Sequence, residues 1–197
     1  MSIKQRMIRF FVLSAIGLLL GAAIAGISIF SGKQGTHANK VSFSLINQDG
    51  KPVTDKDFYG RYMLVYFGFT SCPAICPTEL QKMSEAYQLL PPESQKRIQP
   101  VFITVDPERD TLKVLKGYVD LFMPELMGMT GTPEQIDAVK KSFRVYASKV
   151  KEGDSYTMDH SSFIYFIGLD GQILAMFKTA DKPDDIKTRI MELHGLD

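Results

Sequence analysis

Two cysteines, Cys72 and Cys76, are separated by three residues, and a proline follows each of them directly. The apolar run from Met63 to Phe69 precedes them and has the composition of a buried strand. A proline is tolerated in the first turn of a helix, where its missing N–H would be unbonded anyway. The segment 63–80 therefore predicts a strand, a tight loop and a helix N-terminus, with both thiols at the junction of loop and helix.

A thiol at a helix N-terminus is in a field that favours the thiolate, which is the nucleophile and the metal ligand. Side chains four positions apart on a helix share one face, with Cβ atoms about 5–6 Å apart. Two sulfurs placed in this way can close a disulfide or bind one soft metal ion. A purely stabilising disulfide is the alternative, although so short a loop contributes little loop-closure entropy.

A metal site would need a further ligand, and His160, in the sequence MDHSSF, is the informative histidine. It precedes an expected strand over 163–167. Spacing alone leaves two interpretations equally open: a nitrogen donor beside the sulfurs, or an edge histidine bonded to Asp159 or to a serine. His37 lies in a polar stretch and is interpreted as solvated, and His194 is interpreted as exposed helix surface.

The elements that must position these residues alternate along the chain. A strand–helix–strand unit around the cysteines implies a parallel central pair, and a late hairpin implies an antiparallel edge. The chain therefore predicts an α/β, thioredoxin-like fold. From apolar periodicity and turn signals we expect strands over 41–45, 52–53, 63–69, 98–105, 163–167 and 173–177, and helices over 78–90, 111–118, 133–143 and 183–193.

The first thirty residues differ from the rest in composition. Residues 10–30 are apolar and uncharged, and such a run is long enough to cross a bilayer. All charges in residues 1–9 are basic, which predicts a cytoplasmic N-terminus. We therefore expect a transmembrane anchor over 10–30, a linker over 31–40 and an extracytoplasmic domain over 41–197. A cleaved signal peptide is the alternative.

The extracytoplasmic space is oxidising, so a functional dithiol there would need a reductant. The whole chain of 197 residues has a formal net charge of +1, which gives no electrostatic reason to expect a nucleic-acid partner. The expected location is a bacterial inner membrane, with the domain facing the periplasm, or the mitochondrial inner membrane in a eukaryote.

Three motifs, YFGFTSCPAICPTEL, FITVDPERDT and DHSSFIYFIGLDG, occur in this order and closely resemble the Sco/SenC family from about residue 43 to residue 193. The resemblance implies a thioredoxin-like copper-binding protein that helps to assemble the binuclear copper centre of cytochrome c oxidase. It implies Cys72 and Cys76 as thiolate ligands and His160 as the imidazole ligand. The implied partners are the copper-site subunit of the oxidase, a periplasmic thiol reductant and the membrane.

This ligand set is chemically reasonable, because two thiolates and an imidazole suit Cu(I), and one added ligand would admit Cu(II). Zinc would be left with an open position. Asp159 could orient the His160 ring, and Asp106 could face the cysteines or simply form a turn. Thioethers are a further candidate set, more usually found in packing: Met123, Met127 and Met129.

Two enzyme alternatives remain beside a chaperone that is not an enzyme. CPTEL at 76–80 also resembles the peroxidatic segment of peroxiredoxins, in which Cys76 would attack peroxide and Cys72 would resolve it. That pattern expects a threonine where this chain has Pro73. The other alternative is a thiol–disulfide oxidoreductase acting on the oxidase subunit, a task that usually uses C-x-x-C. His160 discriminates, because copper delivery requires it and dithiol exchange does not.

Overall fold

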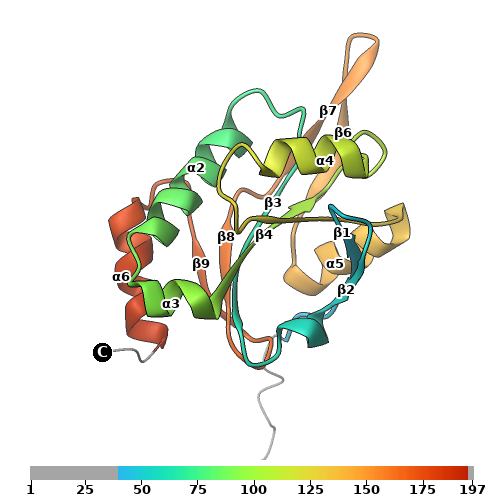
Figure 1. Ribbon diagram of the computed structural model, residues 1–197. Helices are drawn as coiled ribbons and strands as arrows, with labels where there is room; N and C mark the ends of the chain where they lie inside the picture. Colours follow the sequence, from blue (N-terminus) through green and yellow to red (C-terminus); the bar gives the residue numbers. More distant parts are fainter. Residues whose placement is uncertain (1–39, 195–197) are drawn as a thin grey trace, which may run out of the picture. The chain divides into compact units, whose positions relative to one another are not determined.

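Seven strands form one mixed sheet in the computed structural model, which describes residues 40–194 (Figure 1). Their spatial order is β2-β1-β5-β4-β3-β8-β9, with β4 parallel to both β3 and β5, and β8 antiparallel to β3. This arrangement confirms the predicted α/β, thioredoxin-like fold. The strands are β1 (Ser44–Asn47), β2 (Pro52–Thr54), β3 (Tyr62–Gly68), β4 (Ile98–Thr104), β5 (Met127–Thr130), β8 (Ile164–Ile167) and β9 (Ile173–Phe177).

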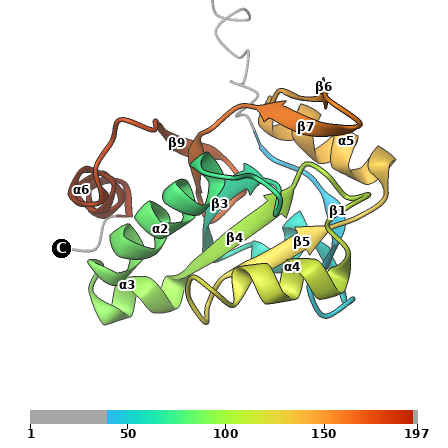
Figure 2. The same ribbon diagram turned by 90° about the horizontal axis from the view of Figure 1, so that it is seen from above.

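Helices cover both faces of this sheet (Figure 2). On one face the ring of Phe102 in β4 packs against Tyr118, with centroids 5.4 Å apart, and Tyr118 belongs to α4. On the other face Phe67 of β3 packs against Phe143 of α5, with centroids 5.0 Å apart. Helix α6 lies beside α2. The helices are α2 (Ile75–Gln88), α3 (Pro92–Arg97), α4 (Leu112–Val119), α5 (Pro133–Phe143), α6 (Pro183–His194) and the 3₁₀ helix η1 (Asp55–Phe58).

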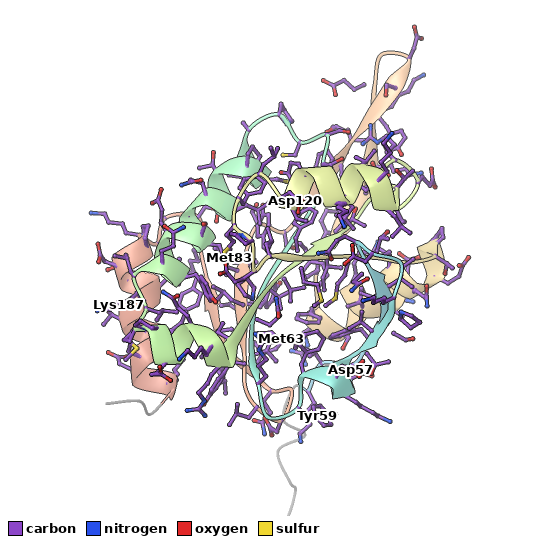
Figure 3. The ribbon with its side chains drawn as sticks, viewed as in Figure 1. Asp57, Tyr59, Met63, Met83, Asp120 and Lys187 are labelled. Atoms are coloured by element: carbon purple, nitrogen blue, oxygen red, sulfur yellow. The ribbon has the colours of Figure 1, made fainter. Side chains whose placement is uncertain are left out.

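Strands β3 and β4 are buried along their whole length. Because helices cover both faces, every side chain of these strands meets protein, which explains why the sequence shows continuous apolar runs instead of alternation. Figure 3 shows Met63 of β3 and Met83 of α2 inside the domain, whereas Asp57 and Asp120 lie at its surface. The site is therefore built on the most deeply buried part of the sheet.

Helix α2 begins at Ile75 rather than at the expected residue 78, so Cys76 lies inside its first turn. The expected starts of α4 and α5 are confirmed by their caps. Thr111 accepts a backbone hydrogen bond at the start of α4, and Thr132 begins α5 with a capping box.

A polar hairpin, formed by β6 (Ala147–Glu152) and β7 (Ser155–His160), was not expected from the sequence. It is a separate two-stranded antiparallel sheet that projects beyond the main sheet (Figure 1). Of its strand residues only Met158 is buried, so no apolar alternation marks it. The short strand β5 and helix α3 were also missed. His160 lies just ahead of β8, as expected, and it also ends the unexpected strand β7.

The predicted anchor over 10–30, the segment 1–9 and nearly all of the linker lie outside the described residues. Between residues 40 and 194, no helix combines the length and the apolar character needed to cross a membrane. The anchor therefore stays a prediction from sequence.

Candidate metal centre

The loop between β3 and α2 carries the two thiols. Cys72 lies in this loop, and the backbone N–H of Cys76 donates to its sulfur, with an N···S distance of 3.3 Å. Both side chains are buried free thiols, and Cys76 has no solvent exposure at all. The structure thus brings both cysteines together at the helix N-terminus, as the sequence predicted.

Gly68, at the end of β3, is a site residue that sequence analysis missed. A Cβ atom at this position would lie 2.9 Å from the Phe102 ring and 3.0 Å from the Cys76 sulfur. Real Cβ atoms do not approach this closely without displacing a neighbour. A glycine inside an apolar run, four residues before a cysteine, is a signal that could have indicated this close approach.

The two thiols differ strongly in acidity. The pKa of Cys72 is lowered to about 4, first because the Cys76 thiol donates a hydrogen bond to its sulfur, with further donation from the Cys76 backbone N–H. The pKa of Cys76 is raised, because it is the donor of that bond and because it is buried. The metal-free pair therefore holds one thiolate and one proton at neutral pH. Binding a metal through both sulfurs would release that proton.

His160 reaches the thiols from the end of β7, at the base of the hairpin. Its Nε2 lies 3.5 Å from the Cys76 sulfur, and its Nδ1 lies 3.0 Å from the carbonyl oxygen of Ser161. A carbonyl can only accept, so in the neutral ring Nδ1 carries the proton and Nε2 presents its lone pair toward the sulfur. The ring also meets Tyr66 and Phe69 edge-on, at centroid distances of 6.3 and 5.8 Å.

Two of the supporting roles considered for carboxylates are wrong in this structure. Asp159 is exposed, and the Ser161 carbonyl orients the His160 ring in its place. Asp106 is buried, but its side chain accepts hydrogen bonds from Arg109 and Tyr156 rather than facing the thiols.

The other candidate ligands do not join the centre. Met123 and Met129 are buried in the hydrophobic core, and Met127 packs against it, which confirms the packing interpretation of these thioethers. His37 lies outside the described residues, and so does the side chain of His194.

A hollow of about 310 Å³ opens beside the centre and is bounded by the cysteine loop and β7. Within the part of the chain that the structure describes, no three His, Cys, Asp or Glu side chains already surround a common point as metal ligands. The three predicted ligands do adjoin one another, and they offer a thiolate, an acidifiable thiol and an imidazole lone pair. This donor set fits one soft ion after a small closure of the side chains.

A thioredoxin-like fold with a dithiol at its first strand–helix junction defines a class of thiol-dependent and metal-binding proteins. The SCO1/SenC family model matches residues 31–195, and the chain belongs to this family. The match confirms the resemblance that the three motifs indicated.

Relatives and solved structures agree with this assignment. The mitochondrial SCO1 homolog of Mus musculus is 46% identical over 147 residues, covering 73% of this chain and 52% of the relative. The copper-bound crystal structure of Arabidopsis thaliana ScoI matches with a TM-score of 0.75 and 39% identity, covering 80% of this chain and 99% of that one. The chain spans about half the length of the curated relatives that it matches.

A second similar structure is that of BsSco, described as a member of the Sco family of cytochrome c oxidase assembly proteins with a disulfide switch. It matches with a TM-score of 0.64 and 29% identity, covering 82% of this chain and 96% of that one. Copper binding and thiol redox change are thus both described for proteins of this fold and family.

Proposed function

We propose that this protein is a membrane-anchored copper chaperone that binds one copper ion through Cys72, Cys76 and His160. The ion would pass to the copper-site subunit of cytochrome c oxidase, so that copper is the cargo rather than a resident cofactor. The observation that carries the proposal is the imidazole Nε2 at 3.5 Å from the Cys76 sulfur. Dithiol exchange has no need of this imidazole, whereas a copper site does.

The donor chemistry supports copper in two oxidation states. Two thiolates satisfy Cu(I), which accepts few soft ligands, and the His160 nitrogen adds the donor that Cu(II) prefers. Only the dithiol can bind, because a disulfide offers no thiolate. A reductant outside the cytoplasm would therefore act upstream of copper loading.

The acidity of Cys72 favours thiol–disulfide exchange as a second candidate function. In that reaction the Cys72 thiolate attacks a client disulfide, and Cys76 then displaces the client thiol, leaving a Cys72–Cys76 disulfide and a reduced client. The same acidity order weighs against the peroxidase alternative, because there Cys76 would have to be the thiolate. Its pKa is raised and its side chain is fully buried.

The substitution His160→Ala separates copper delivery from exchange. We expect Cu(II) affinity to fall by about 10- to 100-fold, with a smaller loss for Cu(I), and oxidase activity in cells to fall although the dithiol is intact. Lys151→Ala, at an exposed position of the same hairpin, is the matched control. Normal oxidase activity with His160→Ala, together with lost activity in the cysteine variants, would favour exchange instead.

The proposal also includes the anchor over residues 10–30 and an extracytoplasmic domain. The positive charges before the apolar run support this orientation. A reporter enzyme that works only outside the cytoplasm should be active when fused after Asp197. Activity of a reporter restricted to the cytoplasm at the same position would contradict the orientation.

A further inference from the structure

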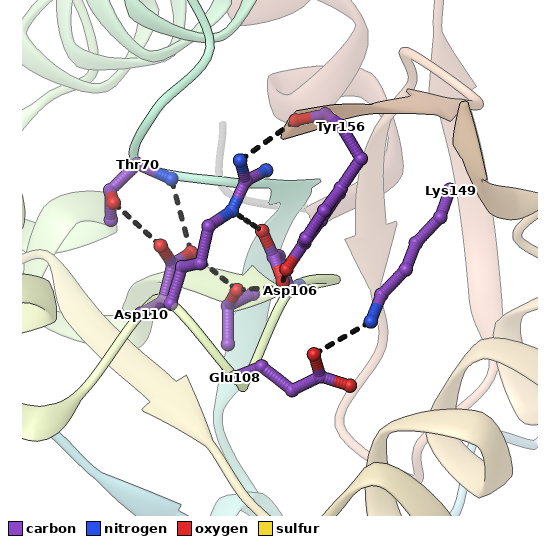
Figure 4. A network of polar contacts seen from close by, with 8 residues as sticks. Thr70, Asp106, Glu108, Asp110, Lys149 and Tyr156 are labelled. Carbon is purple, nitrogen blue, oxygen red and sulfur yellow. Dashed lines mark hydrogen bonds and ion pairs between the residues drawn. The ribbon is translucent and has the colours of Figure 1, made fainter. Parts of the chain in front are cut away.

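The turn that follows β4, residues 106–110, lies between the cysteine loop and the hairpin that carries His160 (Figure 4). It begins and ends with a buried aspartate, Asp106 at 1% exposure and Asp110 at 0%. Neither carboxylate belongs to the proposed ligand set. Asp110 bonds to the cysteine loop, and Asp106 bonds to the hairpin that carries His160.

Asp110 holds the cysteine half. Its carboxylate accepts from the Thr70 backbone N–H at 3.0 Å and from the Thr70 hydroxyl at 2.5 Å. It also accepts from the hydroxyl of Thr104, the last residue of β4, at 2.5 Å. Thr70 lies two residues before Cys72. One buried carboxylate therefore ties the start of the cysteine loop to the end of the neighbouring strand.

Asp106 and Arg109 hold the histidine half. Asp106 accepts from the Tyr156 hydroxyl at 2.9 Å and from Nε of Arg109. Arg109 Nη1 donates to the Tyr156 backbone carbonyl at 2.8 Å, and its guanidinium carbon lies 3.9 Å from the centroid of the Tyr156 ring. Tyr156 is on β7, four residues before His160. The tyrosine is thus held at its ring, its hydroxyl and its backbone.

The hairpin needs such a clamp. Neither β6 nor β7 pairs with a strand of the main sheet in the described chain, and a two-stranded ribbon is marginally stable on its own. Arg109 also approaches the Phe69 ring, at 5.9 Å from guanidinium carbon to centroid. Phe69 is one of the two rings that meet His160 edge-on. One guanidinium therefore contacts both β7 near the turn of the hairpin and the wall of the site.

We propose that residues 106–110 are a positioning element that sets the His160 imidazole against the Cys72–Cys76 dithiol, with Asp110 fixing the thiols and Asp106 with Arg109 fixing the imidazole. This inference rests on the proposed function, because it concerns the ligands named there. It assigns two separable effects to two ends of one five-residue turn. Loosening the hairpin should weaken the binding of Cu(II), which prefers a nitrogen donor. Loosening the cysteine loop should weaken the binding of both Cu(I) and Cu(II).

The test compares Arg109→Lys, Tyr156→Phe and Asp110→Asn in the full-length protein purified in detergent. Arg109→Lys keeps the charge but loses the two-pronged contact, and we expect Cu(II) affinity to fall about 10- to 100-fold, with Cu(I) affinity within about threefold of wild type. Tyr156→Phe removes only the hydroxyl, and it should lower Cu(II) affinity relative to Cu(I) affinity by a smaller factor. Asp110→Asn should weaken Cu(I) and Cu(II) in parallel. Glu152→Gln, at an exposed position of β6 on the same hairpin, is the control.

A metal-free readout keeps the inference independent of copper delivery. In reduced apoprotein, nuclear Overhauser contacts between the His160 and Phe69 rings should weaken in Arg109→Lys and persist in Glu152→Gln. Equal losses of Cu(I) and Cu(II) affinity in Arg109→Lys, or ring contacts unchanged from wild type, would overturn the inference. If Arg109→Lys does not fold, Tyr156→Phe decides by the same two criteria. Wild-type protein that binds no copper would instead overturn the proposed function and leave the ring contacts as the test of positioning.

Discussion

The cysteine loop and the β6–β7 hairpin carry the proposed ligands of one centre but are held by different forces. The loop joins a strand buried along its full length to a helix whose inward face is buried, so apolar packing fixes the thiols together with the buried Asp110 carboxylate. The hairpin buries one strand residue and depends on hydrogen bonds and ring contacts made by Arg109 and Tyr156. The thiols are therefore part of the core, whereas the imidazole is docked against it.

This difference has a consequence for function. Polar contacts at the rim of a domain exchange with water at a smaller free-energy cost than the burial of a core strand. A chaperone must bind its ion and then release it. A site with a fixed dithiol and a detachable imidazole allows the coordination to change at the histidine while the sulfurs keep their places.

The largest expected effect comes from breaking the fixed half at its sulfurs. Cys72→Ala or Cys76→Ala should each abolish tight copper binding, because one thiolate cannot hold Cu(I) against competing thiols in solution. Oxidation of wild-type protein to the disulfide should have the same effect, and reduction should reverse it. Copper content after dialysis against a Cu(I) chelator measures all three. Equal copper uptake by oxidised and reduced protein would place the copper elsewhere. It would contradict the assignment of the two thiols as copper ligands.

The dithiol itself should show a second large effect in its reaction with iodoacetamide. Since the pKa of Cys72 is lowered to about 4, its thiolate persists as pH falls and is lost only as pH passes through that value. Cys72 should therefore react at nearly constant rate from pH 8 to about pH 5, whereas an ordinary thiol slows tenfold per pH unit below about 8.5. Cys76, with a raised pKa and no exposure, should stay unmodified.

Peptide mapping of the alkylated protein measures this selectivity, and Cys72→Ala provides the control for Cys76. Modification of Cys76 in preference to Cys72 at pH 6 would reverse the assignment of nucleophile. It would also restore the peroxidase alternative.

The same contrast explains how much could be predicted from the sequence. Strand β3, strand β4 and the start of α5 were predictable, because apolar runs, prolines and the Thr132 cap act over a few residues. The hairpin was not, because KVKEGDSYT has no apolar period and its partner is Arg109, 47 residues away from Tyr156. His160 was identified from its motif, but its bond to Ser161 rather than to Asp159 depends on how the chain turns after β7.

The smallest expected effects come from replacing one glycine in each region with alanine. Gly68→Ala places a methyl group 2.9 Å from the Phe102 ring and 3.0 Å from the Cys76 sulfur, inside the fixed half. The helix start must move, and overpacking of this kind costs about 1–3 kcal/mol in the free energy of unfolding. Because Cys76 moves with the helix, Cu(I) affinity should fall with stability.

Gly153, at the tip of the hairpin, is the matched position. Its φ of 58° strains any L-residue, but an added Cβ would meet nothing within 4 Å. Gly153→Ala should therefore cost about 1–2 kcal/mol locally, since the left-handed conformation is its only penalty. Copper affinity should not change, because the clamp at Tyr156 lies between the tip and His160. Urea unfolding and Cu(I) competition on both variants measure the contrast, and a loss of copper affinity with Gly153→Ala would show that the hairpin transmits strain past its clamp.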